Sequence, residues 1–292
     1  MLENVDVNSI INILNEEGIV DNNVIATINK TGSTDGIVYL LSEHDEAKYV
    51  LKIDRPHQIT LTEQFLGTYR HLRLFPKILY TDPAKAYIVY TYITGTTHFN
   101  RGSKIEWLTI LVKELFNNYE KYVQTDKWGR LGSPIQSWRE WNYRSLVDTR
   151  NDWGSLLSIE DYTRVESIFE NISKNEDQEV RYLLHGDTGV HNFVFHDNLL
   201  VGVIDPSPMI GPMLYDFTYA FCSSPDDLNL ETLMAAFNLL HHESIEESRL
   251  IEEVIFQLYC RIGICIKLHP HDLEDYLKAW EYWKSLQFLK IS

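Results

Sequence analysis

The hydrophobic pattern of the chain changes from strand-like to helix-like near residue 95. Residues 6–17 carry Ile10, Ile11 and Leu14 on one helical face, which predicts a short amphipathic helix. Shorter apolar runs bounded by polar turns follow, which is typical of strands. The expected elements are strand, polar turn and strand over 24–43, strands over 48–54, 77–82 and 86–93, and a helix over about 60–72.

Beyond Gly95 the apolar residues recur with the helical period over about 104–124, 158–173 and most of 226–290. Two short strands, 192–195 and 200–205, interrupt these helices. The pattern therefore predicts an α+β fold with two lobes. A small lobe, residues 1–93, would hold an antiparallel sheet and one helix, and a larger, mostly helical lobe would cover 94–292.

Composition narrows the class of protein. The chain has 292 residues, of which 44% are hydrophobic, so it can bury a substantial core. Its formal net charge of −16 excludes a basic surface of the kind that binds nucleic acid. Such a surface suits a cationic substrate or a bound metal, and it equally serves solubility alone.

The cysteines and the N-terminus indicate the compartment. Cys222, Cys260 and Cys265 leave one thiol unpaired in any disulfide scheme and form no CxxC, which favours reduced thiols. The acidic start MLENVDVNSI does not resemble a signal peptide, and no run reaches the ~18 apolar residues of a membrane span. We therefore expect a cytoplasmic protein without a membrane partner, and the sequence leaves its oligomeric state open.

Dense polar chemistry follows the apolar run Tyr182–Leu184, in the stretch HGDTGVHN over 185–192. A β-hairpin through 196–198 would return the chain toward this stretch, so that Asp187, Asn192 and Asp205 surround one small volume. Oxygen ligands from Asn192 and Asp205 suit Mg²⁺ when phosphate oxygens and water complete its shell. Asp187 would then be free to orient and deprotonate a hydroxyl.

The stretch HGDTGVHN, with VIDPSPMIGPMLYD after it, resembles the aminoglycoside phosphotransferase family of the protein-kinase-like superfamily. The resemblance runs from about residue 24 to about 221 and implies the two-lobed kinase-like fold, with a nucleotide-binding N-terminal lobe. It also implies phosphoryl transfer from ATP or GTP with Mg²⁺. The positions that match the family pattern are His185, Gly186, Asp187, Asn192, Ile204, Asp205, Gly211 and Asp216.

The resemblance assigns roles in the N-terminal lobe. Lys52 corresponds to the lysine that binds the α- and β-phosphates, and Glu63 on the following helix is expected to pair with it. The turn between the first two strands would touch the β-phosphate, and the segment at the lobe junction would bind adenine through its backbone. The residues in these two segments are Gly32, Ser33 and Thr34, and then Thr91, Tyr92 and Ile93.

In the larger lobe the resemblance makes Asp187 the residue that aligns the acceptor hydroxyl, and Asn192 and Asp205 the Mg²⁺ ligands. His185 would brace the loop, and Asp216 would anchor it through backbone N–H groups. His191 departs from the small or acidic residues common at its position, and its role stays open. Zinc binding by the loop histidines is disfavoured, because their spacing is unusual and Asp with Asn suits Mg²⁺ better.

The resemblance implies that the acceptor is a small molecule with a hydroxyl group. An aminoglycoside or related amino-sugar antibiotic is the leading interpretation, which would make the protein a resistance enzyme. Choline, homoserine or sugar kinases are the alternative, and a pseudokinase is a further one. The acidic segment 243–253 either binds ammonium groups or forms a solvated helix face. Four aromatic residues either line a pocket or belong to the core: Trp138, Trp141, Tyr143 and Trp153.

Overall fold

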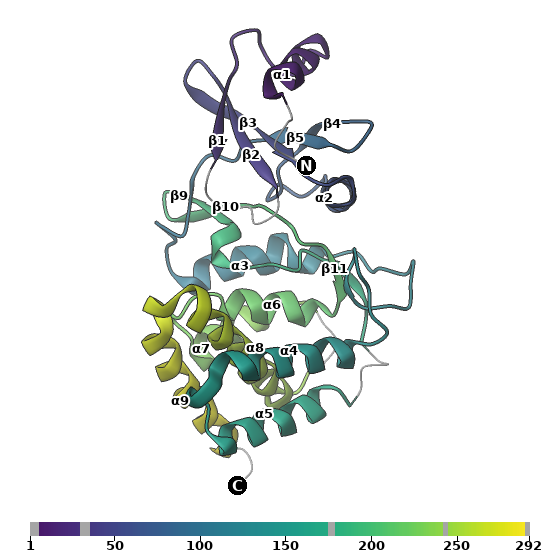
Figure 1. Cartoon of the computed structure of the whole chain (residues 1–292). Coiled ribbons are helices and arrows are strands. Elements are labelled where there is room, and N and C mark those ends of the chain that lie inside the picture. The colour runs from purple at the N-terminus through teal and green to yellow at the C-terminus, as the bar shows by residue number, and fades with distance from the viewer. Residues whose placement is uncertain (1–5, 30–35, 175–178, 242–244, 290–292) are drawn as a thin grey trace. The chain divides into compact units, whose positions relative to one another are not determined.

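The computed structural model describes residues 6–29, 36–174, 179–241 and 245–289. The chain divides into two compact units (Figure 1). The first unit comprises Met1–Asn100 with Phe193–Pro208, and the second comprises Arg101–Asn192 with Met209–Ser292. This division differs from the linear one expected at residue 93, because the chain returns to the first unit for 16 residues, 193–208. The mixture of antiparallel sheets and helices confirms the predicted α+β class.

The first unit contains a five-stranded antiparallel sheet in the order β1-β2-β3-β5-β4. All five strands lie where the sequence predicts them. Strand β3 is central, pairs with β2 on one side and β5 on the other, and carries Lys52. The strands are β1 (Ile25–Asn29), β2 (Ile37–Glu43), β3 (Glu46–Ile53), β4 (Ile78–Thr81) and β5 (Tyr87–Thr91).

Two helices accompany this sheet. Helix α1 (Val7–Glu16) begins after Asp6, whose carboxylate accepts the backbone N–H of Asn8. It buries Ile10 and Leu14 in a core shared with the sheet, as its predicted apolar face requires. Helix α2 (Pro56–Thr68) begins four residues earlier than about residue 60, because Pro56 supplies a favourable first helical residue.

The predicted hairpin is confirmed and belongs to the first unit. Strands β9 (Phe193–His196) and β10 (Leu199–Val203) pair with His196 opposite Leu199. The two turn residues, Asp197 and Asn198, have φ of 49° and 63°, as a type I′ turn requires. Strand β6 (Thr96–Thr97) joins the outer side of β9 and completes a three-stranded sheet.

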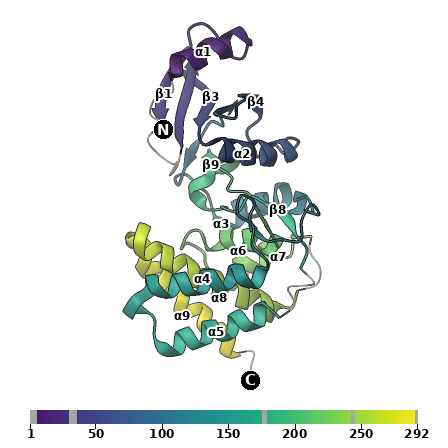
Figure 2. The same ribbon diagram turned by 45° about the vertical axis from the view of Figure 1, so that its right-hand side comes forward.

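The second unit is a helical assembly organised around α8. Helix α8 packs against α4, α5, α6 and α9, and Figure 2 shows α4 and α5 beside it. Its buried residues cover most of its circumference, as expected of a central helix. The helices are α3 (Lys104–Glu114), α4 (Trp138–Trp153), α5 (Ile159–Ile172), α6 (Met213–Cys222), α7 (Leu230–Phe237), α8 (Glu247–Leu268) and α9 (Leu273–Leu289).

Helix α3 ends ten residues before the predicted end at residue 124. A short 3-10 turn, Phe116–Asn118, follows it, and Tyr119 then adopts extended backbone. The extended segment forms backbone hydrogen bonds with the chain near Tyr182, including one from Leu183 to the Glu120 carbonyl. The helical period of this segment is therefore overridden by long-range pairing, which a local pattern does not contain.

A small sheet in the order β7-β11-β8 carries the chain to the polar stretch. Strands β7 (Gly129–Arg130) and β8 (Tyr182–Leu184) flank β11 (Met209–Gly211). Gly211 lies so close to its neighbours that a Cβ there would be 2.9 Å from Leu184 and 3.0 Å from Trp138. Close packing of strand and helix thus requires glycine at this position.

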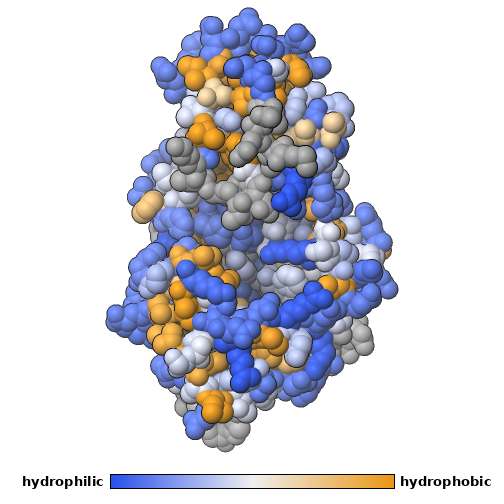
Figure 3. Space-filling model, in the orientation of Figure 1, coloured by the Kyte–Doolittle hydropathy of each residue, from blue (hydrophilic) through white to orange (hydrophobic). Residues whose placement is uncertain are grey.

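Hydrophilic side chains cover most of the visible surface of each unit, with apolar groups between them in patches (Figure 3). This agrees with the strongly negative net charge of the chain. Among the described helices, none has the length and apolar character needed to cross a bilayer.

Candidate active site

The polar stretch forms a tightly bonded loop directly after β8 in the second unit. His185 is fully buried, and its Nδ1 accepts a hydrogen bond from the backbone N–H of Asp187 at 3.3 Å. Gly186 has φ of 75°, in the left-handed region that favours glycine. This conformation directs the Gly186 N–H to the carboxylate of Asp216, which lies 3.2 Å away.

Asp216, on α6, holds both the polar loop and the Tyr119 segment from a fully buried position. Besides the bond from Gly186, its carboxylate accepts the Tyr119 hydroxyl at 2.6 Å, and its backbone carbonyl accepts Thr188 Oγ1 at 2.8 Å. Burial raises the pKa of Asp216 to about 6, although the bonds from Tyr119 and Gly186 favour its charged form. The early end of α3 is explained here, because Tyr119 leaves the helix and reaches this carboxylate.

The carboxylate of Asp187 receives hydrogen bonds at both oxygens. Tyr219 donates its hydroxyl to Oδ1 at 3.0 Å, Asn192 donates Nδ2 to Oδ2 at 2.9 Å, and His191 Nε2 lies 3.2 Å from Oδ2. Burial disfavours the charge on Asp187, but the hydrogen bond and positive charge of His191, together with His185 and Tyr219, outweigh burial and lower its pKa to about 2. Asp187 is therefore ionised at neutral pH, and its carboxylate is held in one orientation.

Asn192 is oriented by the same loop. Its Nδ2 also donates to the Asp187 backbone carbonyl at 2.9 Å, and its own N–H donates to the Gly189 carbonyl. Both Nδ2 bonds are directed to Asp187, and the amide oxygen of Asn192 has no hydrogen-bond partner among the described residues, so it can bind a cation. The side chain is buried, so its direction is fixed by the fold.

Lys52 and Asp205 form an ion pair within the first unit. The Lys52 ammonium lies 2.7 Å from Asp205 Oδ1. Lys52 is buried on β3, whereas the Asp205 side chain retains 37% of its exposure. Asp205 follows β10 with φ of 52°, and β10 is fixed by a bond from Val203 N–H to the Leu74 carbonyl. Lys52 and Asp205 are 153 residues apart in the sequence, and strands β3 and β10 of the first unit bring them together.

Glu63 does not take the part expected of it. Among the described residues of the first unit, it pairs with Lys85 at 2.6 Å, while Lys52 pairs with Asp205. The reason is local: α2 packs against β4 and β5, and the turn between these strands carries Lys85 to Glu63. The expected Lys52–Glu63 pair is therefore wrong for this structure.

The remaining nucleotide-site predictions have different outcomes. Gly32, Ser33 and Thr34 lie outside the described residues. The Thr91 N–H donates to the Lys77 carbonyl and the Tyr92 N–H to the Lys48 carbonyl, so both groups are used within the first unit. An adenine could therefore form hydrogen bonds only with the carbonyl groups of this segment or with the N–H of Ile93.

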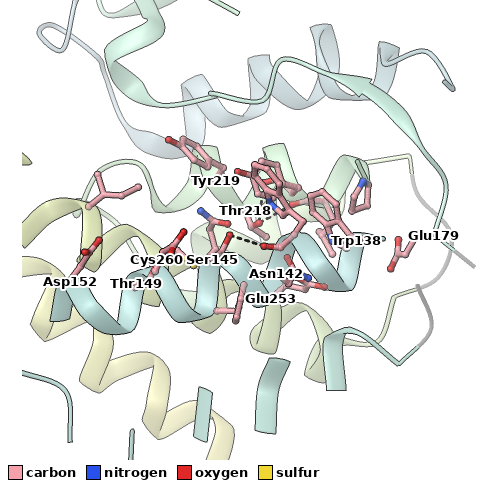
Figure 4. A pocket seen from close by; sticks show the side chains of 18 residues that line it. Trp138, Asn142, Ser145, Thr149, Asp152, Glu179, Thr218, Tyr219, Glu253 and Cys260 are labelled. Carbon is pink, nitrogen blue, oxygen red and sulfur yellow. Dashed lines mark hydrogen bonds between the residues drawn. The ribbon is translucent and has the colours of Figure 1, made fainter. Parts of the chain in front are cut away.

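A pocket in the second unit reaches Tyr219, the donor to Asp187. It has about 250 Å³ of free space, and its walls come mainly from α4, α6 and α8. Figure 4 shows Tyr219 and Thr218 of α6 across from Asn142, Ser145 and Thr149 of α4. Aromatic side chains form part of its wall: Trp138, Trp141, Tyr215, Tyr219 and Phe256.

Four carboxylates line the same pocket, and none of the described lysines or arginines does. Arg249 pairs with Glu253 at 2.6 Å and with Glu179 at 3.5 Å, and Lys267 pairs with Asp152. Burial raises the pKa of Glu253 to about 7, and Arg249 opposes this. Within the described part of the chain, the exposed Asp148 has no ion-pair partner, so its charge is available to a cationic ligand.

The structure separates the acceptor-site candidates of the sequence. Trp138 and Trp141 line the pocket, whereas Trp153 is buried against Tyr259 and Tyr143 projects to the surface beside Phe169. In the acidic segment, Glu253 reaches the pocket and Glu252 binds Asn171 instead. Glu243 lies outside the described residues.

The sequence motifs do not single out Tyr219, although its spacing from Asp216 carries a signal. It lies three residues after Asp216 on α6, so both side chains point toward the same side of the helix. A helix placed over residues 213–222 would have directed Tyr219 to the loop that Asp216 anchors.

The chain belongs to the phosphotransferase enzyme family, whose model matches residues 31–247. Among solved structures, the ADP-bound aminoglycoside phosphotransferase APH(2'')-Ib aligns over 93% of this chain and 96% of its own, with a TM-score of 0.56 at 19% identity. The streptomycin–ATP–APH(2'')-IIa ternary complex aligns over 97% of this chain and 97% of its own, with a TM-score of 0.55 at 17% identity. A choline kinase from Cryptosporidium parvum Iowa II aligns over 98% of this chain and 96% of its own, with a TM-score of 0.61 at 11% identity. These likenesses show a common fold, and a search of the curated proteins finds no match.

Proposed function

We propose that this phosphotransferase moves the γ-phosphoryl group of a nucleoside triphosphate to a hydroxyl of a cationic small molecule. The observation that carries the proposal is the setting of Asp187. This carboxylate is ionised and held at both oxygens, and one of its donors, Tyr219, is also a wall of an acidic, aromatic pocket. A base and an acceptor-sized pocket are thus joined through one side chain.

Asp187 acts on the acceptor hydroxyl. In the transfer, the bond from the acceptor oxygen to the γ-phosphorus forms while the bond from that phosphorus to the β-phosphate oxygen breaks. The hydroxyl proton passes to the Asp187 carboxylate. Because its pKa is lowered to about 2, Asp187 is a weak base, so its main contribution is to orient the hydroxyl and to receive the proton late.

Lys52 and Asp205 in the first unit, and Asn192 in the second, each carry a group that can bind a metal–triphosphate. Lys52 is a cation held on a central strand, and a phosphate group can take the place of Asp205 as its partner. The amide oxygen of Asn192 and the carboxylate of Asp205 are hard oxygen donors of the kind that Mg²⁺ prefers. These donors would hold Mg²⁺, which would supply neutralisation of the charge that develops on the phosphates.

The pocket favours a small cationic acceptor. Four carboxylates surround it, and the charge of Asp148 is not compensated by an ion pair with another described residue. Its free space of about 250 Å³ matches one amino-sugar ring or a small ammonium compound. This is below the roughly 300–1,000 Å³ of sites for drug-sized ligands. A larger aminoglycoside would therefore place one ring in the pocket and its other rings outside.

A panel of acceptors tests the proposal. The purified protein is incubated with ATP or GTP, Mg²⁺ and one of three classes of acceptor: aminoglycosides, choline, and neutral sugars. Nucleoside diphosphate release and the mass of the phosphorylated product are measured. We expect turnover with a cationic acceptor only. Turnover confined to neutral sugars would contradict the proposed cationic acceptor but not the phosphotransferase activity. Nucleotide binding without any turnover would favour a pseudokinase.

Two variants assign the roles. D187N should lower kcat by about 10³-fold with little change in nucleotide affinity, because a positioned general base contributes roughly 10²–10⁴-fold. D148N should raise KM for a cationic acceptor several-fold and leave kcat nearly unchanged. It removes a negative charge that attracts the acceptor, and this charge does not lie on the catalytic carboxylate of Asp187. Near wild-type turnover by D187N would exclude the proposed mechanism.

A further inference from the structure

His191 is bonded to the catalytic carboxylate but has no part in the mechanism above. Its Nε2 lies 3.2 Å from Asp187 Oδ2, and its side chain keeps 38% of its exposure. An ionised carboxylate can only accept hydrogen bonds, so Nε2 must carry the proton in this contact. His191 and Asn192 then share one oxygen of Asp187, and Tyr219 holds the other.

Gly189 makes room for this imidazole. A Cβ added at Gly189 would lie 2.4 Å from Cε1 and 2.6 Å from Nδ1 of His191, far inside contact distance. The backbone φ of Gly189 is not in the left-handed region, so glycine is not required there by conformation. The absent side chain therefore serves to let the His191 ring fold back over the loop toward Asp187.

We propose that His191 is a positioning residue that fixes the orientation of the Asp187 carboxylate, and that Gly189 provides the space in which its ring is seated. This inference rests on the proposed function of Asp187. Rotation of the carboxylate would turn Oδ1 away from the side on which Tyr219 and the pocket lie. A donor on Oδ2 opposes that rotation, so His191 acts on the rate of transfer and leaves substrate binding unchanged.

Substitution of His191 tests the first half of the proposal. H191A should lower kcat by about 10- to 100-fold, because misplacement of a reacting group by ~1 Å can cost about 10²-fold. The KM values for nucleotide and acceptor should stay within about twofold. H191Q keeps an N–H donor of similar reach and should recover kcat to within about threefold of wild type. Equal losses in H191A and H191Q, or a change confined to KM, would overturn the proposal.

Substitution of Gly189 tests the second half. G189A should lower kcat while His191 is still present, because the new methyl group displaces the ring. The double variant G189A/H191A should be no slower than H191A alone, since the methyl group acts only through the ring. G67A is the matched control: a Cβ at Gly67 on α2 meets nothing within 4 Å, so kcat should not change. Additive losses in the double variant would show that Gly189 acts through the backbone and would contradict the proposal.

Thermal unfolding separates positioning from folding. H191A and G189A should unfold within a few degrees of wild type, since Asp216 anchors the loop through Gly186 and Thr188. D187N distinguishes a failure of the positioning role of His191 from a failure of the proposed mechanism at Asp187. If D187N is inactive and H191A matches wild type, the positioning role fails and the phosphotransferase mechanism stands. If D187N retains full activity, the mechanism fails and His191 has no carboxylate to position.

Discussion

The two acidic residues expected at the heart of the chemistry are held in opposite ways. Asp187, in the second unit, is largely enclosed and takes hydrogen bonds from three side chains on two elements. Asp205, in the first unit, keeps 37% side-chain exposure and has Lys52 as its ion-pair partner among the described residues. A carboxylate with several fixed donors keeps one orientation, whereas one with a single charged partner can exchange that partner.

The contrast fits two different tasks. Aligning a hydroxyl requires a carboxylate that does not move, because effective positioning depends on sub-ångström geometry. Holding a metal ion requires a carboxylate that can give up its ion pair when the ion and phosphates arrive. We therefore expect changes at Asp205 to alter metal dependence, and changes around Asp187 to alter the rate at saturating metal.

After D187N, the next largest loss of activity is expected from D205N. It should lower kcat/KM by on the order of 100-fold or more, since even substitution of residues that only orient metal ligands typically costs about 10–100-fold. The Mg²⁺ concentration for half-maximal rate should rise. The measurement is a steady-state Mg²⁺ titration of wild type and variant.

D197N is the control for D205N, because it removes the same charge from the hairpin turn of the same unit. The Asp197 side chain is 87% exposed, and asparagine tolerates its φ of 49°. D197N should keep the wild-type Mg²⁺ dependence. An unchanged Mg²⁺ dependence in D205N itself would remove Asp205 from the metal site and end the contrast with Asp187.

A smaller effect, on stability, is expected at the anchor of the Asp187 loop. Burial raises the pKa of Asp216 to about 6 from an ordinary value of 3.8. The folded protein therefore binds more protons than the unfolded chain between these values. The stability contributed by protonated Asp216 is complete below pH 3.8 and is lost as the pH rises through about 6. Its full loss corresponds to roughly 2–3 kcal/mol, at about 1.4 kcal/mol per pKa unit.

D216N checks this sign, because asparagine does not titrate. Urea unfolding of wild type and D216N is compared from pH 4.5 to pH 7.5. The stability of wild type relative to D216N should fall as the pH rises through this window, while the other titrating groups cancel in the difference. Parallel curves would mean that the bonds from Tyr119 and Gly186 keep Asp216 ionised throughout.

The smallest effect is expected from E63Q. Glu63 and Lys85 form a partly exposed pair, and such pairs contribute about 0–1 kcal/mol. E63Q should change kcat and the nucleotide KM by less than about twofold, with K85Q as its matched partner. A large loss of activity in E63Q, but not in K85Q, would indicate that Glu63 leaves Lys85 and serves Lys52 when nucleotide is bound.

Local chemistry made much of the fold predictable. The five strands of the first unit and helix α1 follow the apolar periodicity, and the Asp197-Asn198 turn follows from residues that tolerate positive φ. Polar residues interrupt the apolar face of α4, so the hydrophobic pattern does not predict this helix. The observed end of α3 differs from the predicted one because a tertiary contact, that of Tyr119 with Asp216, decides it.

Residues near one another in the chain are enough to predict the α+β class, the hairpin after Asn192, and the polar residues from which a phosphotransferase would be built. Which of these side chains meet depends on how separate elements pack. In the tertiary structure Lys52 forms an ion pair with Asp205, Glu63 forms one with Lys85, and Tyr219 donates a hydrogen bond to Asp187. Such contacts depend on how separate elements pack, and neither periodicity nor motif spacing records the direction in which a side chain finally points.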